Sequence, residues 1–289
     1  MKAREGSVVL FPGALGDAVC LEPAIAALAA SGRVTLYVRG AAAEVAALFP
    51  DRPCVRSLDA PEVARLFAPQ RDAAGDRWLE EFARIVSFTG ASVAAVVARL
   101  GATGRATLAP FPRPPLSCHA ADYFLRAVSG DPTARARAAR LLAPPLGERA
   151  VAPSPLALLP GSGGRAKRAP QEIYAELASR WRSAGGAVEV LLGPAEAGEA
   201  HAWRDLGRVR EPASISELAA HLAGAAAFAG NDSGPSHVAA ALGRPGVVFF
   251  TSTADADFGP RGSGVRAIQC RSVRAALDAA WESLQPNLP

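Results

Sequence analysis

Three short polar turns contain the residues of this chain that are best suited to chemistry. They read FPGALGDAV over residues 11–19, LPGSGGRAKRAP over residues 159–170 and NDSGPSHVAAALG over residues 231–243. Each turn follows a short apolar run and leads toward a segment with helical spacing of apolar residues. The start of a helix offers unpaired backbone N–H groups and the positive end of the helix dipole, so each turn is a candidate anion site.

The first turn places one carboxylate, Asp17, behind two glycines, Gly13 and Gly16. An acidic residue in the first turn of a helix stabilises that helix by about 1 kcal/mol, so Asp17 is explained either as a helix cap or as a functional acid. The turn does not read G-x-G-x-x-G, and no acidic residue ends the following strand. A dinucleotide fingerprint is therefore not indicated.

The second turn combines backbone access with a cation. Gly161, Gly163 and Gly164 allow close approach of a ligand to the main chain, Ser162 adds a hydroxyl, and Lys167 adds a point charge suited to phosphate. Of 31 basic residues only two are lysine, which makes this lysine conspicuous. The spacing is not that of a Walker A loop. A solvated surface turn is the alternative interpretation.

The third turn contains the helix-capping types Asp232 and Ser233, followed by Gly234 and Pro235, which suit a first helical turn. Helix capping alone would explain these four residues. His237 is different, because a charged histidine is disfavoured near a helix N-terminus, whereas a neutral one can donate a hydrogen bond to a ligand oxygen. No G-x-S-x-G hydrolase motif is present in the chain.

The elements around these turns alternate between strand and helix, which predicts parallel α/β sheets. The pattern strand, glycine turn, helix, strand opens the chain and recurs after a Pro- and Gly-rich stretch at 143–155. We therefore expect domains at 1–150 and 151–289, facing across a cleft, with the terminal helix packing back on the first domain. Expected strands are 7–11, 33–40, 83–88, 105–111, 156–159, 187–193, 226–230 and 246–250. Expected helices are 16–31, 41–49, 61–68, 92–102, a helix after the prolines of 110–115, 170–186, 214–225 and 272–284.

Composition excludes several classes of function. Half of the residues are hydrophobic and 20% are charged, which is typical of a folded globular protein. The net charge of +4 is scattered, so no nucleic-acid partner is expected. The four cysteines form no CxxC pair or zinc spacing, and no metal site is expected. No apolar run approaches the ~20 residues of a membrane span, so we expect a cytoplasmic protein without a transmembrane segment.

Taken together, the three turns resemble those of glycosyltransferase family 9, the ADP-heptose:lipopolysaccharide heptosyltransferase group. The similar segments are GALGDAVCLEPAIAAL, HAADYFLRAVSG, LPGSGGRAKRAPQEIYAELASR, LLGPAE and AGNDSGPSHVAAALGRPGVVFF, which occur in the family's order. The resemblance implies a GT-B architecture with two Rossmann-like, doubly wound domains. The N-terminal domain would bind the acceptor and the C-terminal domain the nucleotide-sugar.

The resemblance also implies roles for individual residues. Asp17 would be the general base that takes the proton of the acceptor hydroxyl, and Glu196 would contact the ribose or nucleoside. The remaining residues expected at the nucleotide-sugar are Gly13, Gly16, Ser162, Gly163, Lys167, Asp232, Ser233, Gly234, Pro235 and His237. The resemblance further implies that transfer inverts the anomeric centre and that the enzyme needs neither a metal nor a cofactor.

The chain departs from the family pattern at three flanking positions. The arginine usual before GALGD is replaced by Phe11 and Pro12, the histidine before PGS is Leu159, and the tryptophan after the lysine is Ala169. The expected activity is sugar transfer from a nucleoside diphosphate, ADP-heptose in the leading interpretation, to a glycan or lipid-linked acceptor at the inner membrane surface. The alternatives are a catalytically weak or inactive relative that binds nucleotide or glycan, and a nucleotide-sugar epimerase of the same architecture.

Overall fold

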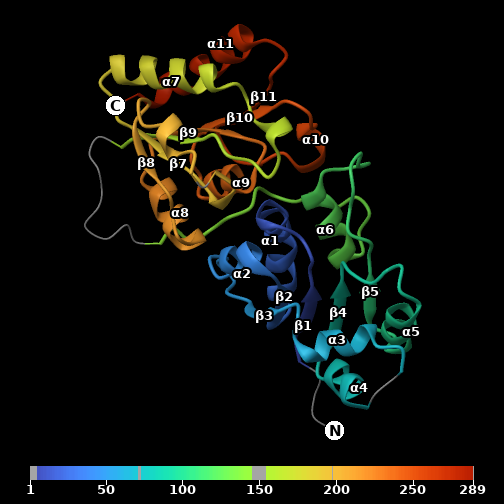
Figure 1. Ribbon diagram of the computed structural model, residues 1–289. Coiled ribbons are helices and arrows are strands. Elements are labelled where there is room, and N and C mark those ends of the chain that lie inside the picture. Colours follow the sequence, from blue (N-terminus) through green and yellow to red (C-terminus); the bar gives the residue numbers. More distant parts are fainter. Residues whose placement is uncertain (1–4, 71–72, 145–153, 197, 289) are drawn as a thin grey trace. The chain divides into compact units, whose positions relative to one another are not determined.

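The computed structural model describes residues 5–70, 73–144, 154–196 and 198–288 (Figure 1). The chain forms two compact units, Met1–Arg137 (unit 1) and Ala138–Pro289 (unit 2). The domain boundary predicted between residues 150 and 151 lies outside the described residues. None of the helices in the described ranges is long and apolar enough to cross a lipid bilayer.

Unit 1 is a five-stranded, wholly parallel sheet in the order β3-β2-β1-β4-β5, with helices in the connections. Its strands are β1 (Ser7–Leu10), β2 (Val34–Val38), β3 (Cys54–Ser57), β4 (Arg84–Ser87) and β5 (Ala106–Leu108). Its helices are α1 (Leu15–Ala29), α2 (Gly40–Ala46), α3 (Pro61–Phe67), α4 (Ala73–Glu80), α5 (Ala94–Ala102) and α6 (Ala120–Ser129).

The central strand of unit 1 is β1, which is buried over its whole length. One core of this unit joins β1 and β4 to α3, α4 and α5, and includes Val8, Ile85 and Leu100. The strand order reverses direction between β1 and β4, because the chain first builds outward through β2 and β3 and then returns to the other side of β1. Ligands of such sheets bind beyond the carboxyl ends of the strands at this switch point, where the turn containing Asp17 begins.

Unit 2 is a six-stranded parallel sheet in the order β11-β10-β9-β6-β7-β8. Its strands are β6 (Leu156–Leu159), β7 (Val188–Leu191), β8 (Arg208–Arg210), β9 (Ala227–Asn231), β10 (Gly246–Phe250) and β11 (Val265–Gln269). Its α-helices are α7 (Gln171–Ser183), α8 (Ile215–Ala223), α9 (Gly234–Ala241), α10 (Asp255–Phe258) and α11 (Val273–Leu284). Its short 3₁₀ turns are η2 (Arg165–Lys167), η3 (Pro194–Glu196), η4 (Ala200–Ala202) and η5 (Gln285–Asn287).

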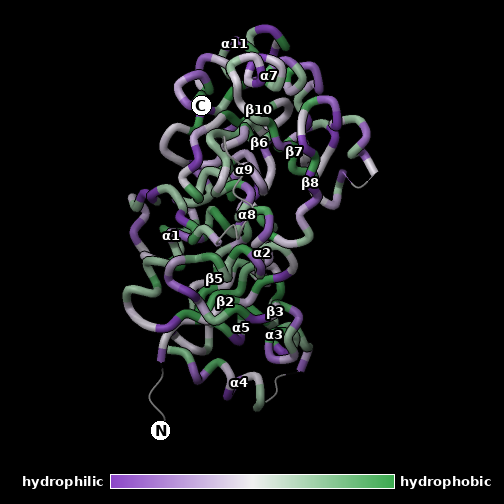
Figure 2. The backbone as a smooth tube through the Cα atoms, turned by 90° about the vertical axis from the view of Figure 1, so that its left-hand side faces the viewer, coloured by the Kyte–Doolittle hydropathy of each residue, from purple (hydrophilic) through white to green (hydrophobic). Residues whose placement is uncertain are grey.

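The core of unit 2 lies between this sheet and the helices α7 and α11, and includes the fully buried Tyr174 and Trp181. The terminal helix α11 packs against α7, β10 and β11 of the same unit. Figure 2 shows hydrophobic residues concentrated along the strands of each unit and hydrophilic residues toward the outer turns. Here the strand order reverses between β6 and β9, so the turns after these two strands flank the switch point.

The predicted fold class, two doubly wound parallel-sheet units of the GT-B type, is confirmed. The strands and helices expected from apolar pattern are present. The sequence reasoning missed α4, the one-turn helix α10 and three edge strands, β3, β8 and β11. β3 and β11 have exposed positions on both faces, and β8 has one exposed and two half-buried positions. None of the three has the continuous apolar run that identifies a buried strand.

Candidate functional site

Two of the three predicted turns emerge side by side in unit 2. β6 and β9 are hydrogen-bonded neighbours with Leu159 opposite Gly230, so both strands end at the same level of the sheet. The turn at 160–164 follows β6, and the turn at 231–234 follows β9. The fold thus joins two motifs that are about 70 residues apart in the sequence.

A direct contact joins the two turns. The ammonium of Lys167 lies 2.9 Å from Oδ2 of Asp232, and the hydroxyl of Thr253, from the loop after β10, donates to the same oxygen at 2.7 Å. Asp232 is largely buried, whereas the Lys167 side chain is 40% exposed. The pair is thus half-buried, with the carboxylate shielded and the ammonium in contact with solvent. The lysine charge therefore remains available to a ligand.

The N-terminus of α9 is not capped in the way the sequence suggested. Ser233 occupies the N-cap position but makes no side-chain capping bond, and among the described residues its buried hydroxyl has no hydrogen-bond partner. Asp232 directs its carboxylate to Lys167 and Thr253 instead. Gly234 and Pro235 begin the helix, and His237 lies buried in its first turn. Plain helix capping consequently does not account for these polar residues.

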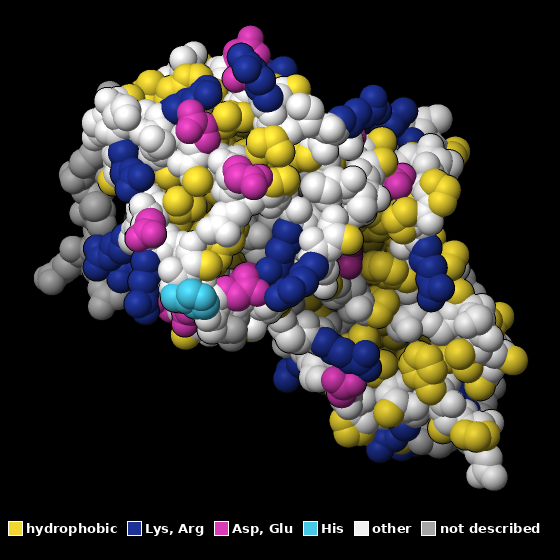
Figure 3. Space-filling model, turned by 45° about the horizontal axis from the view of Figure 1, so that its top comes forward, with side chains coloured by type: hydrophobic (Ala, Val, Ile, Leu, Met, Phe, Trp, Pro, Cys, Tyr) yellow, Lys and Arg dark blue, Asp and Glu magenta, His cyan; other side chains and the backbone are white. Residues whose placement is uncertain are grey.

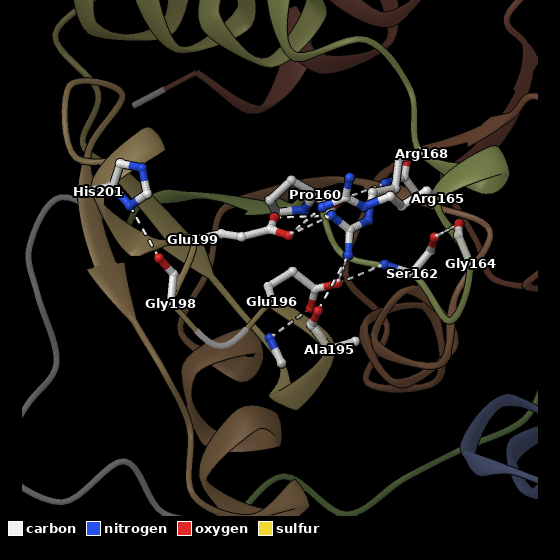
Figure 4. Close-up of polar contacts among 12 residues, drawn as sticks. Pro160, Ser162, Gly164, Arg165, Arg168, Ala195, Glu196, Gly198, Glu199 and His201 are labelled. Carbon is white, nitrogen blue, oxygen red and sulfur yellow. Dashed lines mark hydrogen bonds and ion pairs between the residues drawn. The ribbon is translucent and has the colours of Figure 1, made fainter.

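Glu196 is the centre of a second polar cluster in unit 2 (Figure 4). Its carboxylate is buried and accepts hydrogen bonds from the backbone N–H of Ser162 at 3.2 Å and of Gly193 at 3.1 Å. The guanidinium of Arg168 donates to it at 2.7 Å. A Cβ atom at position 161 would overlap this carboxylate, which explains why Gly161 is a glycine. Glu196 is thereby brought against the turn that contains Ser162.

Asn231 links both ends of the loop that bears Ser162 and Lys167, a role that the sequence reasoning did not assign. Its side chain is fully buried; Oδ1 accepts from the N–H of Ala169 at 2.8 Å and the hydroxyl of Tyr174 at 2.9 Å. Its Nδ2 donates to the carbonyl of Pro160 at 2.6 Å. Burial raises the pKa of Tyr174 well above its ordinary value, so this hydroxyl remains a donor. The sequence signal that could have identified this role is an amide side chain at the end of an apolar strand.

The third predicted turn is in unit 1, where it joins β1 to α1. Oδ2 of Asp17 accepts the N–H of Ala14 at 2.8 Å, and the side chain is half-buried in the first turn of α1. A Cβ on Gly13 would lie 2.5 Å from the ring of Phe11 and 2.7 Å from Cβ of Asp17. Gly13 therefore lets the aspartate approach the end of β1 closely. The predicted capping role of Asp17 is therefore present.

Phe11 occupies the position where the resembled family has a basic residue. Its ring is fully buried in edge-to-face contact with Phe88, Phe111 and Phe124, with centroid separations of 5.8, 5.6 and 5.3 Å. Such aromatic pairs contribute about 0.5–1.5 kcal/mol each beyond simple burial. This position is therefore used for packing beneath the Asp17 turn.

A buried ion pair fixes the same helix. Glu22 on α1 is fully buried and accepts two hydrogen bonds at 2.8 Å from the guanidinium of Arg137. The hydrogen bonds to Glu22 raise the pKa of Arg137 above its ordinary value. The pair anchors the segment that follows α6 to α1.

The surface of the protein carries charges of both signs. On the face shown in Figure 3, basic side chains are interspersed with acidic and apolar ones, and no single basic patch dominates. Among the residues that the structure describes, no group of three or more His, Cys, Asp or Glu side chains converges in a way that could hold a metal ion.

Comparisons with known proteins agree with the architecture. A solved family 9 glycosyltransferase from Veillonella parvula is 14% identical, with a TM-score of 0.77 and coverage of 98% of this chain and 97% of that chain. The ADP-heptose lipopolysaccharide heptosyltransferase II of E. coli is 17% identical, with a TM-score of 0.71 and 98% coverage of both chains. The E. coli heptosyltransferase WaaC with ADP-2-deoxy-2-fluoro heptose is 16% identical, with a TM-score of 0.66 and coverage of 97% and 99%.

At these identities the three structures show a common fold. A comparison with curated protein sequences finds no match. The model of glycosyltransferase family 9 (heptosyltransferase), however, matches residues 130–279, just over half of this chain. The matched range includes Ser162, Lys167, Glu196 and Asp232. The chain therefore belongs to glycosyltransferase family 9 and is a glycosyltransferase.

Proposed function

We propose that this enzyme transfers a heptose or similar sugar from an ADP-linked donor to a glycan or lipid-linked acceptor, with inversion at the anomeric carbon and without a metal. The observation that carries the proposal is the meeting of Lys167, Asp232 and the N-terminus of α9 at the switch point of unit 2. Solved relatives of the same fold were determined with ADP and with an ADP-heptose analogue.

The leaving nucleoside diphosphate gains negative charge as the glycosidic bond breaks. The ammonium of Lys167 is partly exposed and can move from Asp232 to a phosphate oxygen. The helix dipole of α9 and the unpartnered hydroxyl of Ser233 favour an anion at the same place. Preorganised groups of this kind stabilise developing charge without reorganisation during the reaction. They supply the electrostatic role that a divalent cation has in other transferases.

Binding of the rest of the donor is assigned to the neighbouring turns. Ser162 and Gly163 lie in the turn after β6 and would contact the diphosphate, whereas Glu196 would contact the ribose. Gly234, Pro235 and His237 belong to the first turn of α9 and would border the phosphate and sugar. Gly13 and Gly16 would give the donor access to the backbone of unit 1.

Asp17 is assigned as the general base. The acceptor hydroxyl becomes acidic only as it bonds to the cationic anomeric carbon, so a carboxylate of ordinary basicity can take its proton. The carboxylate of Asp17 would accept this proton. The acceptor itself is proposed to be a glycan or lipid-linked saccharide presented at the cytoplasmic surface of the inner membrane.

Nucleotide binding tests the donor half of this proposal. The full-length protein is melted alone and with ADP, GDP, UDP, CMP and their sugars, each with and without EDTA. Ligand at 100 times its Kd adds about 2.7 kcal/mol, which raises the melting temperature by roughly 5–10 °C. We expect this shift for ADP and ADP-heptose, unaltered by EDTA. A melting temperature unmoved by all of these nucleotides would refute the donor assignment.

Turnover tests the catalytic half and separates the alternatives. ADP release is measured from ADP-heptose with and without heptose-free lipopolysaccharide as the acceptor. A transferase releases ADP only with the acceptor, an epimerase consumes the donor without it, and an inactive relative does neither. In Asp17→Asn the amide oxygen can still cap Ala14, so we expect normal ADP binding and a 10²–10⁴-fold lower kcat. Unchanged turnover in this variant would remove Asp17 as the base.

A further inference from the structure

Arg168 is the most heavily engaged side chain of the cluster in Figure 4. One guanidinium nitrogen donates to Glu196 at 2.7 Å, and the other donates to both oxygens of Glu199, at 2.9 and 3.2 Å. Its side chain is 19% exposed. Glu199 therefore fixes the guanidinium from one side while the guanidinium fixes Glu196 from the other.

Glu196 in turn fixes the turn after β6. Its carboxylate accepts the N–H of Ser162, and it has room to do so only because Gly161 has no side chain. The carboxylate is almost completely buried, so it depends on the guanidinium for charge compensation. Removal of Arg168 would leave an unpaired buried carboxylate directly against the backbone that contacts the nucleotide.

We propose that Arg168 is a positioning residue for the donor nucleotide: it holds Glu196 in the orientation in which the carboxylate supports the Ser162 turn and faces the ribose. This role rests on the proposed function of unit 2 as the ADP-sugar site. Arg168 acts through Glu196 and does not itself contact the substrate. It therefore governs donor affinity more than the chemical step.

Isothermal titration of the full-length protein with ADP tests the proposal. Arg168→Gln removes the charge and the paired donors, and we expect ADP to bind about tenfold more weakly, the effect of losing one charge-assisted hydrogen bond. Arg168→Lys keeps the charge but not the fork geometry, so about threefold weaker binding is expected. In steady-state assays the KM for the donor rises in both variants while kcat stays within about twofold.

The chain offers a matched control three residues earlier. Arg165 is also an arginine near Glu199, but its side chain is 88% exposed and the separation is 3.7 Å. Arg165→Gln makes the same chemical change without touching Glu196, and we expect wild-type ADP affinity. Equal weakening in Arg165→Gln and Arg168→Gln would mean that only general charge attraction is lost, and the positioning role would be wrong.

A double-mutant cycle separates positioning from fold stability. If Arg168 acts through Glu196, the double variant Arg168→Gln/Glu196→Gln binds ADP no more weakly than Glu196→Gln alone. If the losses of ADP affinity in the two single variants add up in the double variant, Arg168 does not act through Glu196 and the positioning role is wrong. The role is also wrong if Arg168→Gln and Arg168→Lys both bind ADP as the wild type does. In either case the proposed ADP site itself is unaffected. Failure of the wild type to bind ADP would overturn the proposed function and this role together. Arg168→Lys serves the cycle if Arg168→Gln does not fold.

Discussion

Replacement of Asn231 by alanine tests whether one buried amide holds the loop between β6 and α7 in place. The substitution leaves three buried backbone or side-chain groups without their partner: the N–H of Ala169, the hydroxyl of Tyr174 and the carbonyl of Pro160. An unsatisfied buried polar group costs about 1–3 kcal/mol. Partial relaxation toward other partners lowers the sum, so we expect unit 2 to lose about 3–6 kcal/mol of unfolding free energy.

Urea unfolding followed by tryptophan fluorescence measures this loss. Trp181, Trp203 and Trp281 belong to unit 2, and replacing Trp78 by phenylalanine removes the signal of unit 1. With a slope of about 2 kcal/mol per molar urea, a loss of about 4 kcal/mol lowers the midpoint by about 2 M. The ADP affinity of the folded variant should also fall, because both ends of the loop that bears Lys167 lose their anchor.

The chain contains a second asparagine that serves as the control. Asn287 makes only a long contact, 3.5 Å from its Nδ2 to the carbonyl of Leu284. We expect Asn287→Ala to alter the unfolding free energy by less than about 0.5 kcal/mol. If Asn231→Ala lowers the urea midpoint by no more than Asn287→Ala does, the three hydrogen bonds do not anchor the loop and the reasoning is wrong.

Two further predictions concern other side chains. Lys167→Ala should weaken ADP binding about tenfold or more in calorimetry, since it removes a charged phosphate partner. The melting temperature without ligand should also fall, because the largely buried Asp232 carboxylate loses its cation. Equal ADP affinity would exclude Lys167 from the site. Partial burial raises the pKa of the Cys270 thiol to about 11, so we expect a disulfide reagent at pH 8 to label the exposed Cys54 much faster than Cys270. Because the folded protein holds the Cys270 proton more tightly than the unfolded chain, this thiol favours unfolding as the pH rises from about 9 to 11, and Cys270→Ser should lessen that loss. Labelling of Cys270 in folded Cys54→Ser at pH 8 as fast as that of Cys54 in the wild type would contradict the raised pKa.

The fold was predictable because both sheets have buried central strands with continuous apolar runs. β1, β6, β9 and β10 are buried at every position, and each is followed by glycine or another turn former within a few residues. The edge strands β3, β8 and β11 escaped prediction for the converse reason. Their side chains face solvent on one or both sides, so their pairing is decided by the neighbouring strand rather than by their own composition.

Only those site residues could be predicted whose chemical type is unusual at their place in the sequence. Lys167 and Asp232 have chemistry that stands out in any turn, and the structure joins them. Arg168 does not stand out in a chain whose basic residues are nearly all arginine. Its importance depends on Glu196 and Glu199 reaching it from the segment after β7, which is a tertiary contact that no local pattern encodes.

The polar residues at the start of α9 allow the choice between capping and binding to be made on physical grounds. A capping serine lowers the free energy of a helix by accepting an N–H of the first turn, yet the Ser233 hydroxyl makes no such bond and among the described residues has no partner at all. A buried hydroxyl left unsatisfied costs about 1–3 kcal/mol. A fold keeps such a cost where another molecule completes the hydrogen bond, and the nearby ion pair of Lys167 with Asp232 offers the charge that a phosphate needs. The unsatisfied Ser233 hydroxyl beside this ion pair is thus the strongest structural support for the proposal that the turn binds a diphosphate.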